Sequence, residues 1–381
     1  MKRVKIRRIS LLLLFICVLS LIFGVSANAI YTDDDYVPAL AFETEKINTG
    51  EQSSGALPCG AKISSRFYEL LFDKDENRSE PLYLIPGGDV FGIRVKEHGV
   101  TVSAAEDWSI LHRGDKILSI NDTPINDSDD VTSFMKNHCG GTVKIGIVRG
   151  GEKMTVTATP RCESGSYKLG VNLRRAACGI GTVTFIDPKT NAFGGLGHGI
   201  CDPQTKKPID IESGEVNGVV LGGINRGEVG KPGELSGVLN KRHLGDINVN
   251  GECGVFGRLD ELSTYSSAPI PVGTRDSVKA GAAEIISTVK NGKKATYKIE
   301  ITEIDSSSTG SKSFKIKVTD PTLIALTGGI VRGMSGSPII QNGKLVGAVT
   351  HVMVADPTEG YGIFIENMLN AAQNQVQPKA A

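Results

Sequence analysis

A glycine-rich turn near the C-terminal end of the chain has the residue types of a serine nucleophile. The turn, Gly333-Met334-Ser335-Gly336-Ser337-Pro338, lies between apolar runs. Glycines allow a tight turn in which backbone N–H groups converge on one point. We therefore predict that Ser335 Oγ is a nucleophile and that the N–H groups of Gly333 and Ser335 form its oxyanion hole. A polar hairpin turn is the alternative, since glycine, serine and proline are common in turns.

A serine nucleophile needs a base, and a second glycine-rich segment supplies a histidine. His198 lies in the run Phe193-Gly194-Gly195-Leu196-Gly197-His198-Gly199. A neutral imidazole near pH 7 accepts the proton of a serine hydroxyl, so we predict His198 as the base. A histidine in a surface turn would show the same pattern. His351, on the predicted strand after Ser335, is the alternative base.

The cysteines suggest neither a metal site nor a thiol nucleophile. Seven are present and none forms a Cys-x-x-Cys pair, so no structural zinc site is expected. Cys178 and Cys201 flank the His198 segment, and a disulfide between them would fix the loop that carries the base. Cys201 is a poor nucleophile candidate because its spacing from His198 need not bring the two side chains together. We expect no cofactor and no metal.

Composition restricts the class of protein. The 381 residues include 42 basic and 42 acidic side chains, and a balanced charge argues against a nucleic-acid partner. With 40% hydrophobic residues the chain can bury a core of two or three domains. The 46 glycines among short Val/Ile/Thr runs indicate a mainly β protein.

The N-terminal segment predicts export. Residues 2–8 carry five positive charges, residues 9–25 are almost purely apolar, and Ala27-Asn28-Ala29 is a plausible signal-peptidase site. We expect residues 1–30 to be a signal peptide or a membrane anchor, with the remainder outside the membrane. Polar and acidic stretches then predict a linker region over residues 31–80.

Residues 81–160 have the pattern of a small peptide-binding domain. Predicted strands flank a helix that begins near Asp127, and the segment Gly114-Asp115-Lys116-Ile117-Leu118-Ser119-Ile120-Asn121 is similar to the most recognisable segment of PDZ domains. This similarity implies a loop and strand that bind a peptide ligand. The expected residues are Gly88, Val90, Phe91, Gly92 and Ile93. Asp89 inside this loop would repel a terminal carboxylate, so binding of an internal segment stays an alternative. An unrelated small α+β domain is the other alternative.

Residues 162–370 have a sequence pattern typical of a catalytic β domain. Short strands separated by glycine turns favour a double β-barrel or a sandwich. His198 would come from the first half and Ser335 from the second, so the site would lie between the halves. We expect residues 371–381 to form a C-terminal tail.

The serine segment, followed by Leu345-Val346-Gly347-Ala348-Val349, resembles the nucleophile segment of chymotrypsin-fold serine peptidases, and the histidine precedes the serine as in that fold. With the export signal, the PDZ-like segment and Gly195-Leu196-Gly197-His198-Gly199, the whole chain resembles the stage IV sporulation protein B peptidases. The resemblance implies a PDZ-like domain followed by a chymotrypsin-like double β-barrel.

The resemblance also implies an exported serine endopeptidase of sporulation signalling. Such an enzyme acts in the forespore intermembrane space, cleaves itself and a protein of a membrane complex, and so triggers intramembrane processing of a late mother-cell sigma factor. The family's third catalytic residue is an aspartate just before the serine segment, which corresponds to Asp320, fifteen residues ahead of Ser335. In the wider chymotrypsin pattern the acid lies further upstream, so Asp202 and Asp246 stay alternatives.

Two other functions fit the same residues. One is an exported PDZ scaffold whose second domain binds without cleaving. The other is a Ser-Lys peptidase of the tail-processing type, for which Lys344 is the nearest lysine to Ser335.

Overall fold

The computed structural model describes residues 36–38, 41–43 and 82–374, except 164, 175–176, 203–205, 263–266 and 290–291. The predicted signal peptide or anchor (1–30), most of the predicted linker and the tail beyond residue 374 lie outside the described residues. Two short strands of the linker region are described, β1 (Tyr36–Pro38) and β2 (Ala41–Glu43). In the described ranges, no helix has the length and apolar character needed to span a membrane.

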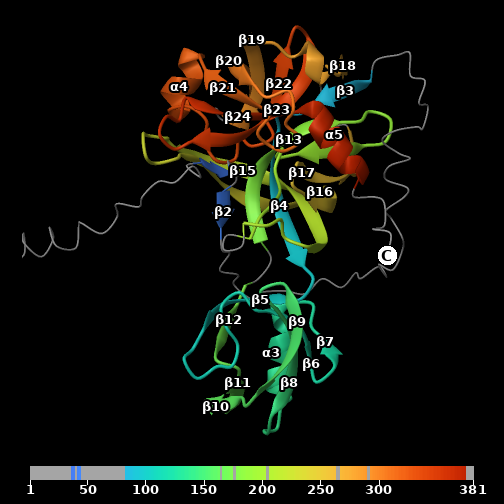
Figure 1. Ribbon diagram of the computed structural model, residues 1–381, viewed down its shortest axis with the longest axis vertical. Helices are drawn as coiled ribbons and strands as arrows, with labels where there is room; N and C mark the ends of the chain where they lie inside the picture. Colours follow the sequence, from blue (N-terminus) through green and yellow to red (C-terminus); the bar gives the residue numbers. More distant parts are fainter. Residues whose placement is uncertain are drawn as a thin grey trace, which may run out of the picture. The chain divides into compact units, whose positions relative to one another are not determined.

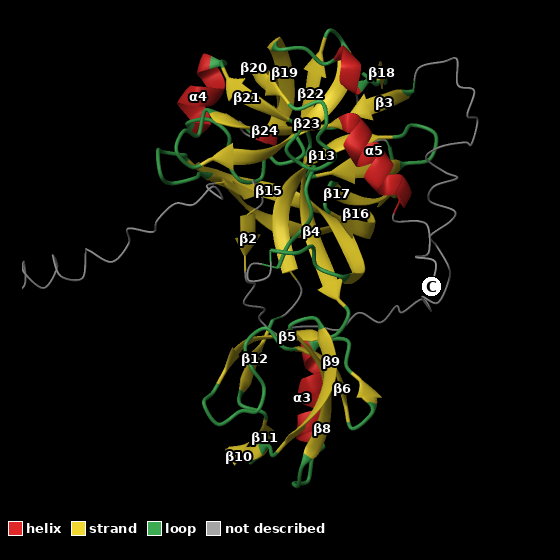
Figure 2. Ribbon diagram, in the orientation of Figure 1, coloured by secondary structure: helices red, strands yellow, loops and turns green. Residues whose placement is uncertain are grey.

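Strands make up most of the described chain (Figure 2), and six of them close into a first barrel. Its strands are β14 (Ala192–Gly195), β17 (Gly254–Leu259), β16 (Glu234–Gly251), β15 (Ile211–Asn225), β4 (Val90–Glu97) and β13 (Ala177–Ile186), and β13 pairs back with β14. Phe91, Val183 and Phe193 are among the apolar side chains that fill the interior. Two short strands extend this sheet, β3 (Tyr83–Pro86) on β13 and β18 (Ile270–Pro271) on β3.

Six further strands close into a second barrel. In order around it they are β23 (Lys344–Met353), β22 (Pro338–Gln341), β19 (Gly281–Thr288), β20 (Lys294–Ile304), β21 (Phe314–Val318) and β24 (Glu359–Phe364), and β24 pairs back with β23. Helix α4 (Pro321–Thr327) precedes the serine turn, and α5 (Ile365–Asn374) follows β24. Figure 1 labels the strands of both barrels except β14. The prediction of a mainly β protein with a double β-barrel is confirmed.

A separate hydrophobic core belongs to the PDZ-like unit. Its sheet has the strand order β12 (Val171–Leu173), β5 (Val100–Ala105), β6 (Lys116–Ile120), β8 (Val143–Arg149) and β9 (Glu152–Ala158). The short strand β7 (Thr123–Pro124) pairs with β6, and β10 (Arg161–Glu163) pairs with β11 (Ser166–Lys168). Helix α3 (Ser128–Lys136) buries Val131 and Met135 and begins at Asp127, which closes a capping box with Asp130.

The strand pairing gives the PDZ-like unit other boundaries than the predicted 81–160. Strands β3 and β4 belong to the first barrel, and the unit begins only at β5 and ends with β12. It is therefore inserted into the first barrel, between the neighbouring strands β4 and β13. Alternating apolar residues next to glycine turns occur in both kinds of sheet, so the sequence pattern did not distinguish them.

Candidate active site

The serine turn has the backbone conformation that its glycines predict. Gly333 and Gly336 have φ angles of +96° and +94°, which side chains with a Cβ rarely adopt. A Cβ on Gly336 would also lie 2.0 Å from the Thr182 carbonyl oxygen, so the close approach of β13 needs glycine there. Ser335 is completely buried at the end of this turn.

Two threonines of the first barrel hold the turn from the opposite side. Thr182 Oγ1 donates to the Gly333 carbonyl and Thr184 Oγ1 donates to the Gly336 carbonyl, both at 2.8 Å. The Thr182 N–H also donates to the Ser335 carbonyl at 2.9 Å. The nucleophile turn of the second barrel is thus fixed by β13 of the first. Sequence reasoning missed these residues, although two threonines two positions apart in an apolar strand were a usable signal.

The predicted oxyanion-hole donors are available. Among the described residues, the N–H groups of Gly333 and Ser335 donate to no hydrogen bond, whereas the N–H groups of Met334 and Gly336 are used within the fold. These two unpaired N–H groups, separated by one residue, can donate to an oxygen that becomes negatively charged.

His198 follows β14 in a loop that is tightly held. Leu196 and Gly197, the two residues before it, have φ angles of +66° and +70°. Beyond it, Asn250 of β16 accepts a hydrogen bond from the Ile200 N–H and donates to the carbonyls of Ile200 and Ile209, each at 2.8 Å. Asn250 therefore positions the loop that carries His198. In the described part of the chain, no disulfide joins Cys178 to Cys201, so the bridge considered from the sequence is not formed.

The ring of His198 is arranged as a neutral base. Its Nδ1 lies 2.9 Å from the Gly199 carbonyl oxygen, which only an Nδ1–H tautomer can satisfy. Nε2 then carries the lone pair, and it is buried with no hydrogen-bond partner in the described structure. Burial lowers the pKa of His198 to about 4, although the hydrogen bond with Gly199 opposes this effect.

Ser335 and His198 do not hydrogen bond to each other in this conformation. Ser335 Oγ donates to the carbonyl oxygen of Leu196 at 2.8 Å, with the Thr350 carbonyl at 3.2 Å. Leu196 is two residues before His198, so both side chains lie at the same interface between barrels. The serine hydroxyl is thus held by the backbone of the histidine loop instead of by the imidazole.

His351, the alternative base, lies beside His198. The two ring centroids are 5.3 Å apart, and both side chains are buried. Burial lowers the pKa of His351 well below its usual value, and the neighbouring His198 and Lys312 lower it further. Both imidazoles are therefore neutral at pH 7.

The aspartates considered as the catalytic acid contact groups other than His198. Asp320 caps α4: its carboxylate accepts from the N–H groups of Thr322 and Leu323 at 2.9 and 3.1 Å, and from that of Lys298 at 3.3 Å. None of its hydrogen bonds in the described structure reaches His198. Two alternatives have basic partners elsewhere, since Asp202 accepts from Arg174 at 2.8 Å and Asp246 lies 3.3 Å from His243.

The predicted peptide-binding residues require a correction. Gly88 precedes β4, and Val90, Phe91, Gly92 and Ile93 are its first residues. From Val90 the strand pairs with β13 along one edge, and from Gly92 it also pairs with β15 along the other. Both edges are therefore occupied from Gly92 onward, which leaves no free edge for an extended peptide along Gly92 and Ile93. The Gly88 N–H donates to the Val183 carbonyl at 2.8 Å and is not available to a carboxylate. Asp89 instead pairs with Lys294 of the second barrel at 2.7 Å.

Strand β12 is one of the two edge strands of the PDZ-like sheet, and β9 is the other. In the described structure β12 pairs only with β5. The loop before it, Leu169-Gly170, has Gly170 in the left-handed conformation, with φ of +67°.

The Gly114-Asp115 motif has a structural role in the PDZ-like unit, because the buried Asp115 carboxylate accepts two hydrogen bonds from Arg149 and one from the His112 N–H.

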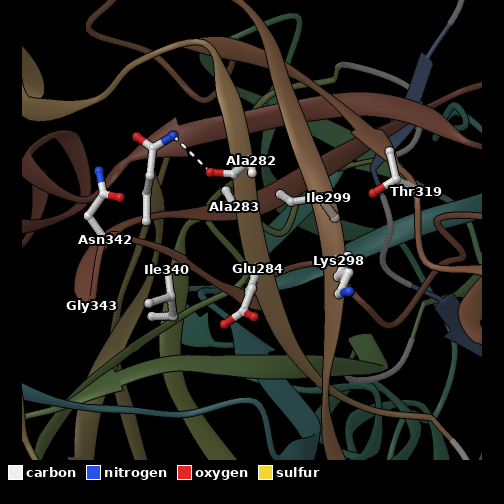
Figure 3. A pocket seen from close by; sticks show the side chains of 10 residues that line it. Ala282, Ala283, Glu284, Lys298, Ile299, Thr319, Ile340, Asn342 and Gly343 are labelled. Atoms are coloured by element: carbon white, nitrogen blue, oxygen red, sulfur yellow. Dashed lines mark hydrogen bonds between the residues drawn. The ribbon is translucent and has the colours of Figure 1, made fainter.

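A pocket of about 410 Å³ opens elsewhere, on the second barrel. Figure 3 shows Glu284, Lys298 and Asn342 around it, with the apolar side chains of Ile299 and Ile340 between them. None of the predicted catalytic residues lines this pocket. Within the described residues no cluster of histidine, cysteine and carboxylate side chains has the geometry of a metal site.

Family models match two parts of the chain. The SpoIVB peptidase S55 family model matches residues 165–369, and the PDZ domain model matches residues 84–159. A search of curated proteins found no match. The match to the SpoIVB peptidase S55 family model spans 205 of the 381 residues.

Three solved structures show weaker similarity. The active form of the Rv3671c protease from M. tuberculosis has 13% identity and a TM-score of 0.31, over 53% of this chain and 76% of that one. The HtrA-type protease AlgW with a decapeptide has 8% identity and a TM-score of 0.31, over 76% and 64%. The PDZ domain of the SdrC-like protein from Listeria monocytogenes has 24% identity and a TM-score of 0.20, over 21% and 90%.

Proposed function

Because the chain belongs to the SpoIVB peptidase S55 family and is a serine endopeptidase, we propose that Ser335 is its nucleophile and His198 its general base. The observation that carries this proposal is the buried, unpaired Nε2 of His198 at the same interface as Ser335. A buried polar nitrogen without a partner costs free energy, and a proton delivered by a serine hydroxyl would satisfy it.

In the proposed reaction, Ser335 Oγ leaves the Leu196 carbonyl and attacks the carbonyl carbon of the scissile peptide. Its proton moves to His198 Nε2, and the N–H groups of Gly333 and Ser335 bind the oxyanion. The tetrahedral intermediate collapses as His198 donates that proton to the departing amine. Water then hydrolyses the acyl-enzyme by the same route.

The Gly199 carbonyl fixes the tautomer of His198 in this mechanism. In the familiar triad a carboxylate accepts the Nδ1–H hydrogen bond, and here the observed acceptor is a backbone oxygen at 2.9 Å. A neutral acceptor stabilises an imidazolium less than a carboxylate does. The resemblance to the family implies Asp320 as the acid by its spacing from Ser335, and that role would require its carboxylate to leave the end of α4.

For the substrate, we propose a protein of a membrane complex together with the chain's own N-terminal region. Support comes from family membership and from the basic and apolar residues 1–30, which predict export or anchoring. In this proposal the enzyme acts in sporulation signalling in the forespore intermembrane space, and its cleavage triggers intramembrane processing of a sigma factor.

The PDZ-like unit would bind a peptide ligand along β12. The edge of this strand opposite β5 has no pairing partner in the described structure, so an extended segment can add to it. This proposal replaces the β4 site expected from the sequence.

Labelling with a fluorophosphonate tests the catalytic proposal. The full chain should label at Ser335, and Ser335→Ala should abolish the label. His198→Gln should lower the labelling rate by at least about a hundredfold, the contribution typical of a general base. Ser337→Ala, two residues away in the same turn, is the matched control and should still label. Equal labelling of the His198→Gln chain and the unaltered chain would refute His198 as the base.

A further inference from the structure

The hairpin of β15 and β16 extends from the first barrel onto the second. At its base, β15 pairs with β4 and β16 pairs with β17, all within the first barrel. At its far end, the Gly227 N–H donates to the carbonyl of Thr327, the last residue of α4, at 2.8 Å. The Gly230 N–H donates to the Val354 carbonyl, also at 2.8 Å. The far half of this hairpin therefore packs on the second barrel, and the side chain of Leu235 is buried in that barrel's hydrophobic core.

The hairpin also pairs with the segment that leads into the nucleophile turn. The Arg332 N–H donates to the Gly233 carbonyl, and the Leu235 N–H donates to the Arg332 carbonyl, both at 2.9 Å. These two bonds form a parallel bridge between Glu234 and Arg332. The packing is close as well, because a Cβ on Gly333 would lie 3.1 Å from the Cβ and Cδ1 atoms of Leu235. A strand of the first barrel thus holds both backbone groups of the residue before Gly333.

The bond to the Arg332 carbonyl affects the oxyanion hole, because that carbonyl and the Gly333 N–H belong to one peptide unit. In a trans peptide the C=O and N–H groups point in opposite directions, and the described residues include no cis peptide bond. A donor that fixes the carbonyl therefore fixes the direction of the N–H. Gly333 itself restrains this peptide little, since glycine adopts positive and negative φ angles about equally well.

The other predicted oxyanion donor is restrained by a different contact. The Ser335 N–H shares its peptide unit with the Met334 carbonyl, which accepts from the Ser337 N–H at 2.9 Å. That hydrogen bond lies within the nucleophile turn itself. The two donors therefore differ in what orients them: the turn sets the Ser335 N–H, and the β15–β16 hairpin sets the Gly333 N–H.

We propose that Leu235 is a positioning residue for catalysis, whose N–H and buried side chain hold the peptide between Arg332 and Gly333 so that its N–H faces the oxyanion. This inference rests on the proposed function and adds the element outside the turn that orients the oxyanion hole. If that peptide rotated, the site would keep Ser335 and His198 but lose one of its two donors. Loss of one oxyanion-hole donor lowers kcat by about a hundredfold to a thousandfold. A purely structural role in joining the barrels would leave the kcat of the folded chain unchanged.

Gly233→Ala tests this role, with Gly223→Ala in the same hairpin as the matched control. A Cβ on Gly233 would lie 2.4 Å from the Asn225 carbonyl oxygen and 2.7 Å from Val331 Cγ1, so the hairpin must shift there. A Cβ on Gly223 meets no atom within 4 Å. With fluorescently labelled unfolded casein as substrate, Gly233→Ala should lower kcat by at least about tenfold at unchanged KM, because an interaction made in the transition state is lost. Fluorophosphonate labelling should slow by a similar factor, since the phosphoryl oxygen occupies the same hole, and Gly223→Ala should change neither rate.

The outcomes separate this inference from the mechanism on which it rests. An unchanged kcat in a folded Gly233→Ala chain that labels at Ser335 would overturn the positioning role and leave the serine mechanism intact. A raised KM at unchanged kcat, or an equal fall in kcat in Gly223→Ala, would overturn it as well. Absence of the label in every chain would overturn the mechanism and this inference together. If Gly233→Ala does not fold, Leu235→Ala should show the same fall in kcat relative to Val238→Ala, whose side chain is 72% exposed on the same strand.

Discussion

Acidification should destabilise this protein through His198. The pKa of His198 is about 4 in the folded chain, because burial disfavours the imidazolium, against an ordinary value near 6.5. The unfolded chain therefore binds a proton between these values that the folded chain does not. Stability from this group is fully present above pH 6.5 and is lost as the pH falls toward 4. By pH 4.5 the loss amounts to roughly 2–3 kcal/mol.

Urea denaturation at pH 8 and pH 4.5 measures this effect when the chain is compared with His198→Gln. Most other groups titrate alike in both chains, so the difference between the chains reports His198 together with its effect on the neighbouring His351. The unaltered chain should lose roughly 2–3 kcal/mol more than the variant between the two pH values. A difference below about 0.5 kcal/mol would mean that water or a carboxylate reaches the ring, and the neutral-base mechanism would be wrong.

Two buried contacts make further predictions. Thr182→Val should leave the Gly333 carbonyl without its donor, which costs about 1–3 kcal/mol in urea denaturation and slows fluorophosphonate labelling; normal labelling would show that β13 does not position the nucleophile turn. Asp115→Asn should destabilise the PDZ-like unit by about 3 kcal/mol, because it removes the carboxylate that Arg149 contacts. Hydrogen exchange should show that loss between β5 and β12 only, and a loss in the barrels would contradict it.

The sequence was most informative where chemistry restricts residue type. A nucleophile turn needs left-handed glycines, and Gly333 and Gly336 have the expected positive φ angles. The double barrel followed from short strands and glycine turns, and family membership followed from the order of the motifs.

The sequence was least informative about long-range pairing. The strand Val90–Glu97 has the same alternation whether it belongs to a PDZ-like sheet or to a barrel, and its partners β13 and β15 lie far along the chain. Asp320 illustrates a second limit, since an aspartate before a proline suits both a triad acid and the cap that it forms here on α4. The contact between Ser335 and the Leu196 carbonyl depends on both barrels together.

The insertion of the PDZ-like unit between two paired strands has a consequence for how the chain folds. Val95 and Ala177 are partners in the first barrel, yet about 80 residues separate them along the chain. Closing an unstructured loop of that length costs about 2 kcal/mol more than closing a loop of about 10 residues. If the inserted unit folds first, its own contacts bring β4 and β13 together and it acts as a turn for the barrel. Barrel formation, and with it the assembly of the nucleophile turn against β13, would then wait for the PDZ-like core.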